Sequence, residues 1–335
     1  MTSKPTTLWS DIDFTREGKQ VDWVYLPHSV TRSAYGEIMI PIAVVKRGPG
    51  KTVLLMAGNH GDEYEGQIAL AKLIRALEPE QITGRVIILP AANLPAAMAG
   101  TRVSPLDGGN LNREFPGDPD GKPTSRIAHY IDSVLLPLCD GFHDLHSGGS
   151  SLQYLPFASM RQSGDADLDR RSLAALRAFA PPIAIIWAYS GAGTYAASAA
   201  NSRKVPNLGG EFGGSGTVDR AGVALVEGGI RRFLVHFGIL PPGGAPAPGA
   251  TRLMEIKGPR YFVYAPDHGL FEPAVDLGQD VASGQLAGHV HFVDNPAREP
   301  VPCHFKADGM VICRRAMGRV ERGDCVFHLA TDLRS

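Results

Sequence analysis

The chain has 335 residues, of which 44% are hydrophobic and 20% are charged, and its formal net charge is −1. This is ordinary globular composition with enough length for two domains, and it lacks the basic surplus that a nucleic-acid or anionic-membrane partner would require. No apolar run approaches the roughly 18 residues of a membrane span, and the N-terminus lacks the apolar segment of a secretory signal. The cysteines are scattered, so we interpret them as reduced thiols of a cytoplasmic protein.

The first part of the chain predicts strands followed by a β-α-β unit. Residues 21–26 and 38–45 are short apolar runs typical of strands. Residues 52–57 are continuously apolar, residues 67–77 carry apolar side chains at helical spacing, and residues 85–90 are again apolar. Strand, helix and strand in this order indicate an α/β domain.

A long segment from 93 to 123, rich in Gly, Pro, Asn and Asp, is expected to be irregular and functional. Beyond it, helical spacing and apolar runs continue to alternate. We expect helices at 124–136, 168–179 and 221–237, and strands at 141–145, 183–187 and 205–208.

The run of Pro, Gly and Ala from 241 to 249 has the composition of a linker. After it, short apolar segments alternate with turn residues, which predicts an all-β C-terminal domain. We therefore expect a catalytic domain over 1–245 and a β domain over 250–335. The β domain's expected strands are 260–265, 288–293, 301–305, 310–314 and 325–330.

The stretch Gly58-Asn59-His60-Gly61-Asp62-Glu63 follows the strand at 52–57 and precedes a helix. In such a turn an imidazole and a carboxylate three residues apart can converge on one cation, as zinc prefers. Taken alone, His60 and Glu63 are equally typical of a polar surface turn.

Two further polar residues also follow predicted strands. His146 comes after one strand and Glu211, flanked by glycines, after another. Functional groups of open α/β sheets collect at the carboxyl ends of strands, so a third metal ligand and a base are expected there. The simpler interpretations are a structural histidine and a salt-bridged glutamate.

The motifs Gly58–Glu63, Asn110–Arg113, Asp144–His146 and Gly210–Gly213 together resemble the succinylglutamate desuccinylase/aspartoacylase family of the zinc carboxypeptidase superfamily. The resemblance covers most of residues 50–240. It implies a zinc-carboxypeptidase-like mixed sheet with helices on both faces. It also implies one Zn²⁺ per chain, although cobalt or manganese suit such ligands too.

The resemblance also implies residue roles. The zinc would be held by His60, Glu63 and His146, and Glu211 would act as general base and acid. Asn112 and Arg113 would bind the substrate carboxylate, and Arg102 would polarise the scissile carbonyl. Asp144, two residues before His146, is placed to orient a metal ligand.

Within the family the chain is most similar to the N-alpha-acetyl-L-2,4-diaminobutyrate deacetylases of ectoine breakdown. The likeness includes Tyr64-Glu65-Gly66, Gly109–Arg113 and His146–Gly149. It implies hydrolysis of an acetyl amide on a small N-acyl amino acid. A carboxypeptidase and a catalytically inactive metabolite-binding protein are the alternatives, and a homo-oligomer is left open.

Segments 269–273, 278–281 and 320–324 resemble biotinyl/lipoyl-type β modules. The turn that carries the modified lysine in such modules reads Arg314-Arg315-Ala316-Met317-Gly318, without lysine. We therefore expect a structural or pocket-shaping role and no covalent cofactor.

Overall fold

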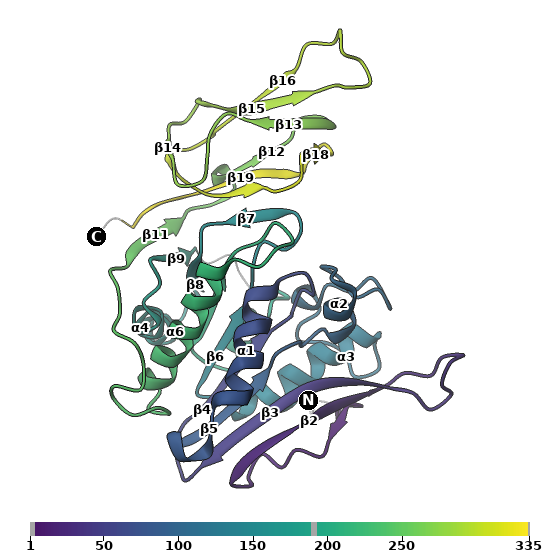
Figure 1. The fold of residues 1–335 in the computed structure, drawn as a ribbon, viewed down its shortest axis with the longest axis vertical. Helices are drawn as coiled ribbons and strands as arrows, with labels where there is room; N and C mark the ends of the chain where they lie inside the picture. Colours follow the sequence, from purple (N-terminus) through teal and green to yellow (C-terminus); the bar gives the residue numbers. More distant parts are fainter. Residues whose placement is uncertain (1–3, 189–192, 334–335) are drawn as a thin grey trace.

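The computed structural model describes residues 4–188 and 193–333. Their backbone forms a mixed α/β fold around one large mixed sheet, with a second, four-stranded sheet from the C-terminal part (Figure 1). The path through the large sheet runs β1-β2-β3-β5-β4-β6-β10-β8-β9-β11-β19-β17-β14, with β7 and β12 attached beside it.

The centre of the large sheet is parallel, as the β-α-β pattern predicts. Its strands are β4 (Thr52–Ala57), β5 (Gly84–Leu89), β6 (Gly141–Leu145) and β10 (Asn207–Glu211). Every residue of β4 is buried, because helices cover the sheet on both faces. The carboxyl ends of these strands meet at one edge, where the polar turns lie.

Each face of the sheet carries its own apolar core. One core joins inward side chains of the strands to α1 (Tyr64–Ala76), α4 (Ala166–Phe179) and α6 (Arg220–His236). The other core joins the alternate side chains to α3 (Pro123–Tyr130) and α5 (Ala196–Ser202). This division follows from the two-residue side-chain period of a strand.

Further strands extend the sheet at both ends, antiparallel on one side and mixed on the other, where β9 pairs in parallel with both β8 and β11. On one side these are β1 (Trp9–Ser10), β2 (Gly18–Pro27) and β3 (Glu37–Arg47). On the other they are β8 (Phe157–Arg161), β9 (Ile183–Trp187), β11 (Arg252–Ile256), β19 (Cys325–Asp332), β17 (Gly309–Arg315), β7 (Leu152–Tyr154), β12 (Phe262–Tyr264) and β14 (Asp280–Val281).

The four-stranded sheet contains β16 (Val301–His304), β15 (Leu286–His291), β13 (Gly269–Pro273) and β18 (Arg319–Val320). It lies at one end of the molecule, beyond β19 and β12 (Figure 1). Because β11 pairs with β9 and β7 pairs with β17, backbone hydrogen bonds join the segments before and after the linker.

The structure corrects several element boundaries. The segment expected to be irregular contains α2 (Leu94–Ala99), a short helix that ends at Gly100 in the left-handed conformation, φ 63°. Only Pro123–Tyr130 of the helix expected at 124–136 is α-helical, and a π turn and a 3₁₀ turn follow it. The strand expected at 205–208 lies at Asn207–Glu211, so Glu211 ends it and does not follow it.

Further short 3₁₀ turns lie at Pro79–Gln81, Leu111–Arg113 and Pro259–Tyr261. The last of these replaces the first half of the strand expected at 260–265. None of the described helices combines the length and apolar character needed to cross a membrane.

Candidate metal centre and active site

The turn between β4 and α1 is pressed tightly against the following β-α connection. A Cβ on Gly61 would lie 2.0 Å from the backbone of Ala96, and one on Gly58 would lie 2.8 Å from Cα of Ala91. Gly58 also has a φ of 67°, which favours glycine. This close packing fixes the direction in which the buried side chains of His60 and Glu63 leave the turn.

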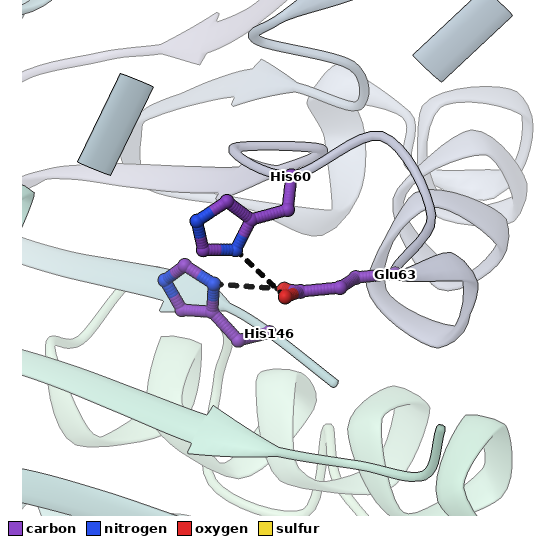
Figure 2. A group of neighbouring side chains, drawn as sticks. All are labelled: His60, Glu63 and His146. Atoms are coloured by element: carbon purple, nitrogen blue, oxygen red, sulfur yellow. Dashed lines mark hydrogen bonds and ion pairs between the residues drawn. The ribbon is translucent and has the colours of Figure 1, made fainter. Parts of the chain in front are cut away.

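His60, Glu63 and His146 converge as the sequence predicts. Nδ1 of His60 lies 2.7 Å from Oε1 of Glu63, and Nδ1 of His146 lies 2.9 Å from Oε2 of the same carboxylate. Figure 2 shows both rings directed at that carboxylate from different parts of the chain. One donor atom from each side chain lies within 4.8 Å of the others.

Hydrogen bonds on the far side of each ring make these donors suitable for a metal. Nε2 of His60 lies 3.1 Å from Oδ1 of Asn110, and Nε2 of His146 lies 2.8 Å from Oδ2 of Asp144. An oxygen acceptor at Nε2 keeps the proton there, so Nδ1 of each ring is free to bind a cation. Asn59 Nδ2 donates to Oδ2 of Asp144 at 2.9 Å and fixes that carboxylate.

The charges at this centre are strongly perturbed. Burial disfavours the ionised form of Glu63, but the neighbouring His60 and His146 outweigh it and hold the pKa of Glu63 below its usual range. Burial likewise opposes protonation of His146, yet Asp144 and Glu63 raise its pKa well above the ordinary value. Two nitrogen donors and one carboxylate that attract positive charge so strongly fit a divalent cation such as zinc.

Glu211 ends β10 beside His146, with which it forms an isolated backbone bridge. Its Oε2 is buried and has no hydrogen-bond partner in the described part of the chain. Burial, followed by the charge of Glu63, raises the pKa of Glu211 well above its ordinary value. A carboxyl group with a raised pKa binds a proton more readily than a free one does, which suits a group that must act as both general base and general acid.

The structure also brings the predicted substrate residues to this edge of the sheet. Nη1 of Arg102 lies 3.2 Å from Oε1 of Glu63, and the Arg102 side chain is 46% exposed, so part of it faces solvent. Oδ1 of Asn112 accepts a hydrogen bond from the Ala196 backbone at 2.9 Å. Arg113 is exposed, and its guanidinium lies 4.7 Å from the centre of the Tyr195 ring.

A pocket adjoins His146 and Glu211, and sequence reasoning missed much of its wall. The wall includes Arg161, Trp187 and Tyr195. The Arg161 guanidinium lies 5.1 Å from the centre of the Trp187 ring and 5.3 Å from the centre of the Tyr195 ring. These residues come from β8, β9 and the start of α5. No local motif marks Arg161 and Trp187, because the pairing of β8 with β9 and β10 brings them to the site.

The family comparison agrees with this geometry. Residues 49–237 match the succinylglutamate desuccinylase/aspartoacylase catalytic domain, and the chain belongs to this family of amide-hydrolysing enzymes. This confirms the resemblance seen in the sequence motifs.

Individual relatives are similar over nearly the whole chain. An N-alpha-acetyl-L-2,4-diaminobutyric acid deacetylase of Halomonas elongata is 40% identical over 98% of this chain and 96% of its own. A succinylglutamate desuccinylase/aspartoacylase structure from Rhodobacter sphaeroides is 40% identical, covers 98% of this chain and 100% of its own, and has a TM-score of 0.93. The product-bound ectoine utilization protein EutE (DoeB) of Ruegeria pomeroyi is 38% identical, covers 98% and 99%, and has a TM-score of 0.94.

Proposed function

We propose that this protein is a zinc-dependent deacylase that removes an acetyl group from a small N-acyl amino acid, with N-alpha-acetyl-L-2,4-diaminobutyrate as the first candidate substrate. The observation that carries the zinc assignment is the convergence of two Nδ1 atoms on the Glu63 carboxylate, with both Nε2 atoms held by oxygen acceptors. The substrate assignment is supported by the 40% identity to the Halomonas elongata deacetylase. A role in ectoine breakdown belongs to the same proposal.

His60, Glu63 and His146 would hold one zinc ion, which supplies a Lewis acid for the amide carbonyl and for water. Glu211 takes a proton from the attacking water and delivers it to the leaving amine. Glu211 lines the same pocket as His146, which supports its access to that water. Breaking the C–N bond then releases acetate and the free amino acid.

Two arginine residues and an asparagine are proposed to contact the substrate. Arg102, whose Nη1 lies 3.2 Å from Glu63, is proposed to stabilise the oxygen of the scissile carbonyl as negative charge develops. Asn112 and Arg113 are proposed to bind the substrate carboxylate, for which a guanidinium offers two parallel donors. The Tyr195 ring lies near both guanidinium groups, 4.7 Å from that of Arg113 and 5.3 Å from that of Arg161.

The C-terminal strands are proposed to form a β module that shapes the pocket. Leu152, Gln153 and Tyr154 of β7 pair with β17, and Met254 of β11 pairs with Ile185 of β9. Tyr154 packs on Phe157, a pocket residue, with ring centres 5.6 Å apart. The pocket wall is therefore backed by strands from both parts of the chain.

The test is a hydrolysis screen of zinc-loaded protein against N-acyl amino acids, followed by mass spectrometry. The panel contains N-alpha-acetyl-2,4-diaminobutyrate, N-acetylaspartate, N-succinylglutamate and dipeptides with a free C-terminus. Each is tested with and without a chelator. We expect chelator-sensitive release of acetate from the diaminobutyrate derivative. If only the peptides are hydrolysed, the protein is a carboxypeptidase. If a panel member binds and none is hydrolysed, the protein is a metabolite-binding protein.

A further inference from the structure

A second buried carboxyl group, that of Glu65, lies beside the proposed metal centre without contacting His60 or His146 in any hydrogen bond of the described chain. Glu65 is in the first turn of α1 and has an exposed fraction of 0%. Its Oε2 accepts a hydrogen bond from Oγ of Ser147 at 2.5 Å, and its Oε1 accepts one from the backbone N–H of Asp219 at 2.8 Å. Burying a carboxyl group is unfavourable unless it is hydrogen-bonded, and here both oxygens are.

These two bonds connect the three segments that carry the site. Glu65 follows the ligand turn, Ser147 is the residue after His146, and Asp219 closes the loop that begins after Glu211. Asp219 is also the N-cap of α6, where its side chain accepts from the backbone N–H groups of Ala221 and Gly222. The bond from Asp219 to Glu65 therefore fixes where the helix after the Glu211 loop begins.

The neighbouring backbone packs closely against the Glu65 side chain. A Cβ on Gly213, two residues after Glu211, would lie 2.4 Å from Oε1 of Glu65, and one on Gly222 would lie 3.3 Å from its Cγ. Both positions are glycine, so the Glu211 loop and the start of α6 rest directly on this carboxyl group. A shift of the Glu65 side chain would therefore displace the Glu211 loop.

Ser147 transmits the same constraint to the metal ligands. Its hydroxyl donates to Glu65, and its backbone N–H donates to Oε2 of Glu63 at 3.1 Å. Oε2 is the atom that faces Nδ1 of His146. One residue thus joins the buried carboxyl group to the carboxylate on which the histidines converge.

We propose that Glu65 is a positioning residue that holds Glu63, His146 and the Glu211 loop at their working separation through Ser147 and Asp219. The inference rests on the proposed function for the roles of those three groups. Glu65 does not line the pocket beside Glu211, and both of its oxygens are occupied. It therefore acts through its neighbours and not on the substrate.

The test compares Glu65→Ala with Glu65→Gln in zinc-loaded protein, using the substrate found in the hydrolysis screen. Partners that orient metal ligands typically contribute about 10- to 100-fold, so we expect Glu65→Ala to lower kcat by that factor while KM changes by less than about threefold. Glu65→Gln keeps an oxygen acceptor for Asp219 and an amide group that the Ser147 hydroxyl can accept from. It should recover kcat to within about fivefold of the wild type.

A second readout does not depend on turnover. Cobalt-substituted protein absorbs visible light with an intensity that depends on ligand geometry, so Glu65→Ala should change that spectrum and Glu65→Gln should restore it. Asp132→Asn is the matched control, because Asp132 is also a buried carboxylate, bonded to Arg203 at 2.6 and 3.0 Å, and within the described residues no hydrogen bond joins its side chain to the site residues. This control should lower the melting temperature and leave kcat and the cobalt spectrum unchanged.

Three results would overturn the proposal. The first is a folded Glu65→Ala protein with wild-type kcat and cobalt spectrum. The second is an equal loss of kcat in Asp132→Asn at an equal melting temperature, which would indicate general destabilisation. The third is a Glu65→Gln protein as inactive as Glu65→Ala with an unchanged cobalt spectrum, which would indicate proton transfer by Glu65.

Ser147→Ala covers the case in which Glu65→Ala does not fold, because it removes only the hydroxyl bond. It should lower kcat by about 3- to 10-fold, consistent with one lost hydrogen bond of about 1 kcal/mol, and should alter the cobalt spectrum. Wild-type values of both would refute the connection. If no panel member is hydrolysed, the proposed function fails, but the cobalt spectra still decide the role of Glu65.

Discussion

Removing the imidazole of His328 should make the stability of this protein less sensitive to acid. His328 lies in β19 with an exposed fraction of 1%, and neither ring nitrogen has a hydrogen-bond partner among the described residues. Its ring stacks on Phe262 at 4.0 Å and lies 5.3 Å from Trp187. Burial lowers the pKa of His328 from 6.5 to about 3.

The size of the effect follows from that shift. Between about pH 6.5 and 3 the unfolded chain binds a proton at this position and the folded chain does not, so stability is full above 6.5 and falls as the pH falls. At about pH 5 the loss from this one histidine is about 2 kcal/mol relative to pH 8, at about 1.4 kcal/mol per pH unit. His328→Phe keeps an aromatic ring against Phe262 and removes the proton site.

The assay is urea unfolding of the metal-free protein at pH 8 and pH 5, with chelator present so that metal binding does not add its own pH dependence. The drop in unfolding free energy between the two pH values should be about 2 kcal/mol smaller in His328→Phe than in the wild type. His304→Phe, at an exposed position of β16, is the matched control and should keep the wild-type drop. An equal drop in His328→Phe and the wild type would refute the reasoning.

Further predictions concern the site. Glu211→Gln should lower kcat by about 10²- to 10⁴-fold with bound zinc unchanged in elemental analysis, and a full hydrolytic rate would remove Glu211 as the base. Arg113→Ala should raise KM by about 10- to 100-fold with a smaller effect on kcat, because a lost charge-assisted hydrogen bond is worth about 1.5–3 kcal/mol. An unchanged KM would place Arg113 outside the substrate site. His60→Ala should no longer retain stoichiometric zinc after dialysis, and full retention would refute the ligand set. Asn110→Ala, which removes the acceptor at Nε2 of His60, should weaken zinc binding by about 10- to 100-fold in a chelator competition, and an unchanged affinity would argue against that hydrogen bond's role.

The parts of the fold that the sequence predicts well are the buried parallel strands. Residues 52–57, 141–145 and 183–187 were expected as strands, the first and the last from their apolar runs, and the structure gives them the same limits. A strand covered on both faces is usually rich in apolar residues, so composition marks the ends of β4 and β9, whereas β6 also buries His143 and Asp144. The proximity of His60, Glu63 and His146 was predictable for a related reason, since each follows such a strand.

The missed elements depend on contacts between distant parts of the chain. Arg252–Ile256 mixes charged and apolar residues and becomes a strand because β9 and β19 provide partners on both sides. The residues of β8 were not expected as a strand for the same reason. Arg161 and Trp187 consequently reach the pocket through a strand pairing that no local pattern reports.

The hydrogen bonds that hold the ligands were only partly visible in the sequence. Asp144 could be assigned an orienting role because it lies two residues before His146 in the same strand ending, and the structure places it at Nε2 of that ring. Asn110 and Glu65 are separated in sequence from the groups they contact, His60 and Asp219. Their contacts arise from the packing of the long loop and of α6 against the ligand turn.

Strand register explains why the proposed centre can form at all. Ala57, the last residue of β4, pairs with Leu145, the last residue of β6, so the ligand turn and His146 leave the sheet side by side. His146 in turn bridges to Glu211. Neighbouring strands lie about 4.8 Å apart, which is within the reach of one carboxylate and two imidazoles around a single ion. A slip of one residue between β4 and β6 would turn every side chain of the slipped strand to the opposite face, so the apolar cores that fix this register also fix the spacing of the ligands.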